Sequence, residues 1–409
     1  MDFIDSIVAN RLGGSSFFNK SKMFKFEKLK KVRDELKLKH PDIEIIDMGV
    51  GEPDKMADKS IVDVLSLEAS KEENRFYADN GISEFKVAAC SYLKDVYNLE
   101  NISPNNIVHG IGSKSILAMI PTCFINPGDI TLMTVPGYPI IANNTKFLGG
   151  EVFNLKLCKE GQFYPNFDSI PYDILKRAKL LYINYPNNPT GQVATTNFYE
   201  KVIDFAKENN ILVVSDVAYG PLVYDGVKPL SIFSVDKNME YSIELHSLSK
   251  AFNMTGWRLA FLLGSKKSID LFSSVKSYND SGQFRAIQKA GIYALTHKEL
   301  IDINIERYDR RFKLLVDALV KVGFAAEKPK GGFYCYVPIP KGIKDKLTFK
   351  NAEEASAYIL SNAFICTVPW DECGGFLRFS VTFEANSIEE EIEIINKLKS
   401  RLLSLDLVF

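Results

Sequence analysis

The sequence predicts an α/β protein, with a large domain on a mainly parallel central sheet and a smaller α+β domain. The chain of 409 residues is too long for one small domain. Its 46% hydrophobic and 25% charged residues are ordinary values for a globular protein. Between about residues 105 and 265 short apolar runs alternate with helical stretches, whereas beyond about residue 300 strands mix with flanking helices.

Six apolar runs in the central region predict the strands of the large domain. Most of them are apolar without strict alternation, as expected where helices cover both faces of a sheet. The amphipathic segment FYEKVIDFAKENN lies between two of the runs and predicts a helix. The predicted strands are NIVHGIG, DITLMTV, KLLYINY, ILVVSDV, YSIELHS and RLAFLLG.

The C-terminal region predicts the smaller domain. IERYDRRFKLLVDALVKVGF predicts a long helix, and GGFYCYVPI and FLRFSVTF predict two strands. The last helix places five apolar residues on one face, namely Ile388, Ile392, Ile395, Leu398 and Leu402. We expect an N-terminal arm and part of the small domain in residues 1–60, the large domain in residues 61–299, and the C-terminal small domain in residues 300–409.

Composition argues against several classes of protein. A net charge of −1 gives no electrostatic reason to expect nucleic acid or an anionic membrane as a partner. The N-terminus lacks the pattern of a signal peptide, and no apolar run reaches the roughly 18 residues of a membrane span. The six cysteines show no metal-binding spacing with the four histidines. We therefore expect a cytoplasmic protein with reduced thiols and no metal.

Polar side chains follow several predicted strands, where the ligand sites of open α/β sheets gather. Gly112, Ser113 and Lys114 open a helix whose first N–H groups suit an anion, although a plain turn explains them equally well. Tyr138 follows DITLMTV and could stack on a planar ligand or simply pack. Asn188 in YPNNPTG could bind a ligand oxygen, but Asn, Pro and Gly also dominate ordinary turns.

Asp216 ends the very apolar strand ILVVSD, where an unpaired carboxylate is costly. It requires a cationic or hydrogen-bonding partner, which is either part of the protein or a pyridinium N–H of a ligand. Tyr219 follows three residues later and could point its phenol into the same space.

The stretch LHSLSKAFNMTGWRL adds an amine and a second group of phosphate donors. Lys250 lies at the mouth of a strand, where an amine of lowered pKa can form a Schiff base with a carbonyl cofactor. Arg258 offers a permanent charge for a phosphate, with Ser247 and Ser249 as further donors. Each feature alone is weak, but their succession at strand ends predicts a pyridoxal phosphate site.

These motifs resemble those of the class I/II aminotransferases, pyridoxal-phosphate enzymes of fold type I, over essentially the whole chain. PNNPTG, SDVAYG, SLSK and NMTGWR stand in the order and spacing of that family. Stretches such as ENRFYADNGISEFK and TVPWDECGGFLRFSVTFEA resemble the LL-diaminopimelate aminotransferases in particular. The resemblance implies the reaction of LL-2,6-diaminopimelate and 2-oxoglutarate to tetrahydrodipicolinate and glutamate, or its reverse, in lysine synthesis.

Three alternatives stay open at the level of sequence. A related aminotransferase would act on aspartate, alanine or aromatic amino acids. A β-lyase uses the same fold and cofactor. A pyridoxal-phosphate-binding regulator would carry a DNA-binding domain, and the sequence shows no basic helix-turn-helix segment.

The resemblance implies a role for each motif residue. Lys250 holds the cofactor and moves the proton, Asp216 binds the pyridine nitrogen, and Tyr219 binds the 3′-oxygen together with Asn188. The implied phosphate ligands are Ser113, Lys114, Ser247, Ser249 and Arg258, with Tyr77 from the neighbouring subunit of a homodimer. The implied substrate ligands are Gly51, Lys114, Tyr138, Asn188 and Arg378, of which Arg378 binds the α-carboxylate and Tyr138 also stacks on the cofactor ring.

Two positions depart from the pattern of the diaminopimelate enzymes. Phe24 stands where a tyrosine usually contacts the substrate, and Ala260 stands where glycine is commoner. We assign the far end of the substrate to Asp79, with Asn279 and Ser281 as further candidates. The segment SYNDSGQF offers no arginine for a lone side-chain carboxylate, which favours diaminopimelate over aspartate.

Overall fold

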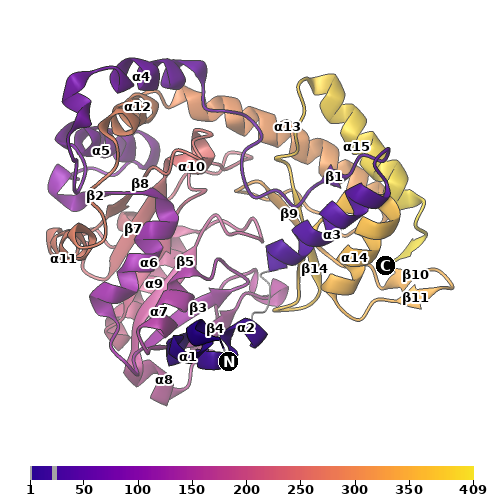
Figure 1. Ribbon diagram of the computed structural model, residues 1–409, viewed down its shortest axis with the longest axis horizontal. Coiled ribbons are helices and arrows are strands. Elements are labelled where there is room, and N and C mark those ends of the chain that lie inside the picture. The colour runs from indigo at the N-terminus through magenta and orange to yellow at the C-terminus, as the bar shows by residue number, and fades with distance from the viewer. Residues whose placement is uncertain (1, 21–24) are drawn as a thin grey trace.

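Two lobes lie side by side in the computed structural model, which describes residues 2–20 and 25–409 (Figure 1). The large lobe surrounds a seven-stranded sheet, and the small lobe holds the C-terminal strands and helices. The long helix α13 (Glu299–Val322) runs from one lobe to the other. The predicted α/β class, with a mainly parallel sheet and a smaller α+β part, is confirmed.

The central sheet has the strand order β2–β8–β7–β6–β5–β3–β4. Strand β8 runs antiparallel to its neighbours β2 and β7, and the other pairs are parallel. All six predicted strands are present, whereas the edge strand β4 mixes exposed and buried residues and was not predicted. The strands are β2 (Ile107–Gly110), β3 (Ile130–Val135), β4 (Glu151–Lys156), β5 (Ala178–Asn184), β6 (Leu212–Asp216), β7 (Ser242–Ser247) and β8 (Ala260–Leu263).

Helices cover both faces of this sheet, which explains its apolar strands. Apolar side chains of α6, α7 and α11 pack against one face, and those of α5, α9 and α12 pack against the other. The predicted helix FYEKVIDFAKENN is α9. The helices of the large lobe are α4 (Lys59–Ala69), α5 (Ser83–Tyr97), α6 (Gly112–Phe124), α7 (Ile140–Phe147), α8 (Tyr172–Arg177), α9 (Thr196–Asn209), α10 (Leu248–Ala251), α11 (Lys266–Ser277) and α12 (Arg285–Thr296).

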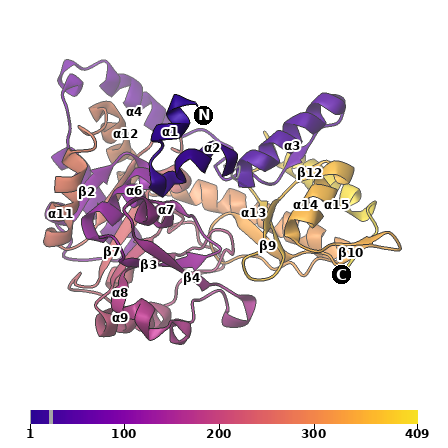
Figure 2. The same cartoon turned by 60° about the horizontal axis from the view of Figure 1, so that its bottom comes forward.

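The N-terminal part of the chain reaches both lobes (Figure 2). Arg33 donates to Asp47 at 2.5 Å and so fastens α3 to β1, which pairs in parallel with β12 of the small lobe. No helix among the described residues is long and apolar enough to span a membrane. The elements concerned are α1 (Phe3–Ile7), α2 (Phe17–Lys20), α3 (Lys25–Lys39), β1 (Ile46–Asp47) and β12 (Ile365–Cys366).

The small lobe contains two further antiparallel sheets and two helices of its own. Strand β14 lies between β13 and β9, and β10 lies between β11 and β15. The predicted strands GGFYCYVPI and FLRFSVTF contain β9 and β14. The elements are β9 (Tyr334–Pro338), β10 (Gly342–Ile343), β11 (Leu347–Thr348), β13 (Val368–Trp370), β14 (Phe376–Ser380), β15 (Leu407–Val408), α14 (Ala352–Ala363) and α15 (Ile388–Leu403).

The predicted apolar face of α15 is only partly correct. Its three later residues are buried, but 48% of Ile388 and 42% of Ile392 is exposed. Glu391 is buried between them and accepts hydrogen bonds from Arg310 and Arg311 of α13, each at 2.8 Å. The first turns of this helix are therefore held by a buried ionic cluster rather than by apolar contact.

Cys158 and Cys373 form a disulfide between the segment after β4 and the turn that joins β13 to β14. The expectation of reduced thiols is therefore wrong for these two residues. They are 215 residues apart in sequence, so no local spacing reveals the pair. The bond joins the edge of the large lobe to a hairpin of the small lobe. The free cysteines are Cys90, Cys123, Cys335 and Cys366.

Candidate active site

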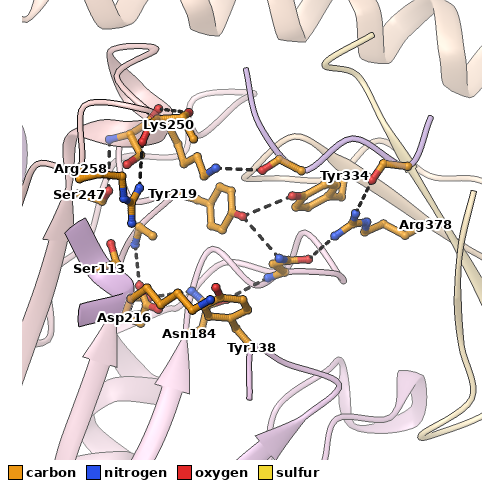
Figure 3. A pocket seen from close by; sticks show the side chains of 17 residues that line it. Ser113, Tyr138, Asn184, Asp216, Tyr219, Ser247, Lys250, Arg258, Tyr334 and Arg378 are labelled. Atoms are coloured by element: carbon orange, nitrogen blue, oxygen red, sulfur yellow. Dashed lines mark hydrogen bonds between the residues drawn. The ribbon is translucent and has the colours of Figure 1, made fainter. Parts of the chain in front are cut away.

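A cavity of about 350 Å³ lies between the carboxyl ends of the central strands and the small lobe (Figure 3). The register places Asp216, the last residue of β6, opposite Asn184, the last residue of β5, and opposite Leu245, two residues before the end of β7. Most of the residues predicted from the motifs meet here. The lining residues are Gly49, Gly51, Ser113, Lys114, Tyr138, Asn184, Asn188, Asp216, Ala218, Tyr219, Ser247, Ser249, Lys250, Thr255, Arg258, Tyr334 and Arg378.

Asp216 is a buried carboxylate on the large-lobe side of this cavity, with 4% of its surface exposed. Its Oδ2 accepts from the Tyr182 hydroxyl at 2.9 Å, and its Oδ1 accepts from the Ala218 amide at 3.0 Å. Burial raises the pKa of Asp216 to about 6, against the lowering effect of these two hydrogen bonds. The carboxylate is thus oriented by neutral donors, and a cationic group of a ligand would stabilise its charge.

Lys250 comes from the short helix α10, directly after β7. Its Nζ donates to the carbonyl oxygen of Gly51 at 2.9 Å. Burial lowers the pKa of Lys250 to about 8; the charges of Arg258 and Arg378 act in the same direction, and that of Glu52 acts against them. The chain therefore holds a reactive amine in the cavity at near-neutral pH.

Donors for an anion gather at one end of the cavity, where α6 begins. Ser113 and Lys114 belong to the first turn of α6, whose amides favour negative charge. Arg258 is held in the left-handed region with φ of 58° and donates to the carbonyl oxygen of Thr255 at 2.8 Å. Gly112 has φ of 74°, which favours glycine, and a Cβ there would also displace the Arg258 guanidinium. Ser247 and Ser249 line the same cavity.

Arg378 faces these groups from β14 of the small lobe, and only 1% of it is exposed. It donates to Asn188 Oδ1 at 3.0 Å and to the carbonyl oxygen of Gly49 at 2.9 Å. Its guanidinium lies over the Tyr334 ring, with Cζ 4.0 Å from the centroid. A buried guanidinium fixed in this way suits a carboxylate.

Asn188 and Tyr219 connect the two sides of the cavity. Asn188 Nδ2 donates to the Tyr219 hydroxyl at 3.4 Å, and that hydroxyl lies 3.4 Å from the Tyr334 hydroxyl. Tyr138, which follows β3, keeps 38% of its surface exposed, so its ring is available to a ligand.

Four of the predicted residues do not line the cavity. Tyr77 is 78% exposed, and the residues assigned to the far end of the substrate are exposed on neighbouring loops, namely Asp79, Asn279 and Ser281. The Ser281 carbonyl accepts from the Asp79 amide at 3.1 Å, and the buried Lys276 donates to the Asp79 carbonyl at 2.5 Å. The two loops therefore form one surface unit. Phe24 lies outside the described residues.

Five lining residues were not predicted from the sequence: Gly49, Asn184, Ala218, Thr255 and Tyr334. Asn184, Ala218 and Thr255 lie beside motif residues, so the motifs themselves could have indicated them. Gly49 lies two residues before Gly51, which was predicted. Tyr334 lies far from every motif in sequence and reaches the cavity only because the small lobe packs against the large one.

The comparisons with known proteins agree with this geometry. A model of the family described as aminotransferase class I and II matches residues 43–395, which include every residue that lines the cavity. Among solved structures, substrate-bound BacF from Bacillus subtilis is 30% identical with a TM-score of 0.86, and the match covers 97% of this chain and 98% of that one.

Curated relatives match the whole chain. An LL-diaminopimelate aminotransferase of Methanocaldococcus jannaschii is 51% identical over 416 residues, covering 100% of this chain and 99% of that protein. An enzyme of the same name from Methanococcus maripaludis is 48% identical over 413 residues, with coverage of 100% and 99%. The resemblance inferred from the motifs is confirmed, and the chain belongs to the aminotransferase class I and II family.

Proposed function

We propose that the protein is a pyridoxal-phosphate-dependent transaminase that interconverts LL-2,6-diaminopimelate plus 2-oxoglutarate and tetrahydrodipicolinate plus glutamate. The observation that carries this substrate is the identity of 51% and 48%, over 100% of the chain, to two enzymes named LL-diaminopimelate aminotransferase. The reaction belongs to the synthesis of diaminopimelate and lysine, and we propose that it takes place in the cytoplasm.

Pyridoxal phosphate suits the groups that the cavity presents. The first turn of α6, with Arg258 and the two serines Ser247 and Ser249, offers donors for the phosphate. The buried carboxylate of Asp216 suits a protonated ring nitrogen, and Asn188 and Tyr219 suit the 3′-oxygen. When bound, this cofactor supplies an aldehyde that takes up the amino group and a ring that accepts electrons.

Lys250 is the proposed site of cofactor attachment and of proton transfer. With a pKa lowered to about 8, a substantial share of its amine is neutral at pH 8 and can take a proton from the substrate Cα. The hydrogen bond from Nζ to the Gly51 carbonyl, at 2.9 Å, holds the amine in the cavity. Asp216, fixed by Tyr182 and the Ala218 amide, holds a proton on the ring nitrogen and so favours loss of the Cα proton.

Arg378 binds the α-carboxylate in this proposal. Its two terminal nitrogens suit a bidentate contact with a carboxylate, which every α-amino acid offers, so this residue confers no choice among donors. The choice must come from the far end of diaminopimelate, which bears both an ammonium and a carboxylate. The neutral and acidic groups at Asp79, Asn279 and Ser281 suit that pair of charges better than a lone carboxylate.

Those three residues and Tyr77 lie outside the cavity of their own chain. We therefore propose a homodimer, in which a second copy brings this surface unit to each cavity. In the same proposal, residues 61–299 form the cofactor-binding domain, and residues 300–409 form a small domain that residues 1–60 join.

The absorbance of the cofactor-loaded protein tests this function directly. LL-diaminopimelate added without an acceptor should convert the aldehyde form of the cofactor to the amine form, and 2-oxoglutarate should restore it. The control Lys250→Ala should bind the cofactor but show no conversion. Failure of every donor to convert the wild-type cofactor would exclude a transaminase, and faster conversion by aspartate, alanine or phenylalanine would favour a related aminotransferase.

A further inference from the structure

Tyr334 touches both sides of the cavity and has no role in the function proposed above. It lies on β9 with 1% of its surface exposed. One face of its ring lies 4.0 Å from Cζ of Arg378, while its hydroxyl lies 3.4 Å from the hydroxyl of Tyr219 (Figure 3). A single side chain therefore contacts the group that suits a carboxylate and the phenol that suits the cofactor.

These contacts connect four side chains in a closed circuit. Arg378 donates to Asn188 Oδ1 at 3.0 Å, and Asn188 Nδ2 donates to Tyr219 at 3.4 Å. Tyr219 meets Tyr334, and Tyr334 stacks on Arg378. The guanidinium is thus fixed within its plane by two hydrogen bonds, and perpendicular to its plane by an aromatic face.

The small lobe, rather than the closed circuit of these four side chains, sets the position of Tyr334. Its backbone lies opposite Ser380 in the pairing of β9 with β14, the strand that carries Arg378. Phe333 packs beside it with centroids 4.7 Å apart and meets Tyr219 edge-on at 5.2 Å. A Cβ at Gly51 would lie 3.3 Å from the Tyr334 hydroxyl, so this phenol also borders the segment that accepts from Lys250.

We propose that Tyr334 is a positioning residue for amino transfer, with its ring holding Arg378 for the α-carboxylate and its hydroxyl orienting the Tyr219 phenol toward the cofactor. This inference rests on the proposed function, which identifies the two ligands as the substrate α-carboxylate and pyridoxal phosphate. It separates two parts of one side chain, because the ring and the hydroxyl act on different partners.

The protonation state of Tyr219 agrees with a separate role for the Tyr334 hydroxyl. Burial, followed by the neighbouring Tyr334 phenol, raises the pKa of Tyr219 above its ordinary value. Tyr219 therefore keeps its proton and acts as a hydrogen-bond donor. It accepts from Asn188, so the direction of its own O–H depends on whether the hydroxyl of Tyr334 is present.

Two substitutions separate the ring from the hydroxyl. Tyr334→Phe keeps the aromatic face beneath Arg378 and removes the contact with Tyr219, whereas Tyr334→Leu removes both. The matched control is Tyr308→Phe, because Tyr308 is equally buried, lies 5.8 Å from Phe333, and has no hydrogen-bond partner for its hydroxyl among the described residues.

Carboxylate binding is measured by calorimetric titration of the cofactor-loaded protein with glutarate, a dicarboxylate without an amino or oxo group. Tyr334→Leu should weaken glutarate binding about tenfold, whereas Tyr334→Phe should leave it within about twofold of wild type. Unchanged binding by the leucine variant would overturn the role of the ring.

The role of the Tyr334 hydroxyl is tested by two measurements, the pH dependence of the cofactor absorbance and kcat with LL-diaminopimelate. Tyr334→Phe should shift the pH at the midpoint of the absorbance change and lower kcat about fivefold. Tyr308→Phe should change neither quantity. A phenylalanine variant equal to wild type in both measurements would overturn the role of the hydroxyl. If Tyr334→Leu does not fold, the phenylalanine variant still decides this part.

Failure of the proposed function has a different signature. A wild-type protein that does not transfer the amino group of LL-diaminopimelate, but binds glutarate in a way that depends on the Tyr334 ring, would contradict the substrate and support the role of the ring.

Discussion

The two walls of the cavity are built in different ways. The large-lobe wall comes from short segments at the ends of the parallel strands β5, β6 and β7 and at the start of α6, so the topology of one sheet brings it together. The small-lobe wall consists of Arg378 and Tyr334, with Gly49 and Gly51 beside them. It reaches the cavity only through contacts between lobes.

The two walls also present different chemical groups to a ligand. The large-lobe wall holds the amine of Lys250, the buried carboxylate of Asp216 and the donors for a phosphate. The small-lobe wall presents the buried guanidinium of Arg378, which we propose binds the substrate carboxylate. Substitutions in the first wall should therefore act mainly on the rate of the chemical step, and substitutions in the second on substrate binding.

Removing the amine from the large-lobe wall should have the largest effect. Lys250→Ala should lower kcat about 10⁴-fold because the base that moves the Cα proton is lost. The phosphate donors remain, so retained cofactor should still be detected after gel filtration. The control Lys266→Ala removes an exposed lysine of α11 that pairs with Asp270 and should be fully active. Near wild-type turnover by Lys250→Ala would contradict the assignment.

Asp216 should make the stability of the cofactor-free protein depend on pH. Its pKa is raised from 3.8 to about 6, so the folded state binds its proton more tightly than the unfolded chain does. The stabilisation is complete below pH 4 and is lost as the pH rises through 6. Relative to Asp216→Asn, the wild type should therefore lose about 2 kcal/mol between pH 4 and pH 7, measured by urea denaturation. A difference independent of pH would show that the carboxylate is not buried as described.

Arg378→Lys tests the small-lobe wall. The lysine keeps the charge but loses the bidentate geometry and the stacking on Tyr334, so KM for 2-oxoglutarate should rise about 30-fold. The control Arg177→Lys changes a half-buried arginine outside the cavity that is paired with Glu151, and it should leave KM unchanged. A variant that lowers kcat without raising KM would break the division between the two walls.

The disulfide should have the smallest effect on catalysis. Cys158 and Cys373 join the lobes close to β14, but Arg378 also has its own hydrogen bonds to Asn188 and Gly49. Cys158→Ser should lower the free energy of unfolding by about 2–4 kcal/mol and change kcat/KM less than about threefold. Cys90→Ser, at a free cysteine, is the control. A large rise in KM in the Cys158 variant would show that the bond, rather than the side-chain contacts, holds the small-lobe wall in place.

The same contrast explains what the sequence could reveal. Asp216 ends β6 and Lys250 follows β7, both within recognisable motifs, and strand ends meet at one edge of a parallel sheet. The edge strand β4 had no comparable signal, because its residues are largely exposed. Tyr334 looks like an ordinary member of an alternating strand, and its place in the cavity depends on how the lobes pack.

Contacts between residues far apart in sequence could not be predicted either, because they depend on how the folded chain packs. Nothing near Glu391 indicates that it is buried with Arg310 and Arg311, so the apolar face predicted for α15 included residues that are exposed. Arg378 was found through the resemblance and through its position on an apolar strand, which requires an anionic partner. The disulfide joins residues 215 positions apart, and only the folded chain brings them together.

The ratio of kcat/KM for two amino donors with 2-oxoglutarate as acceptor tests the central claim most directly. LL-diaminopimelate should exceed aspartate by about 100-fold or more, because Arg378 treats both alike and the groups at Asp79, Asn279 and Ser281 suit a far end that carries an ammonium as well as a carboxylate. The meso isomer should be a poorer donor than the LL isomer, because inversion at the far carbon exchanges those two groups. Comparable values for aspartate and LL-diaminopimelate would contradict the account.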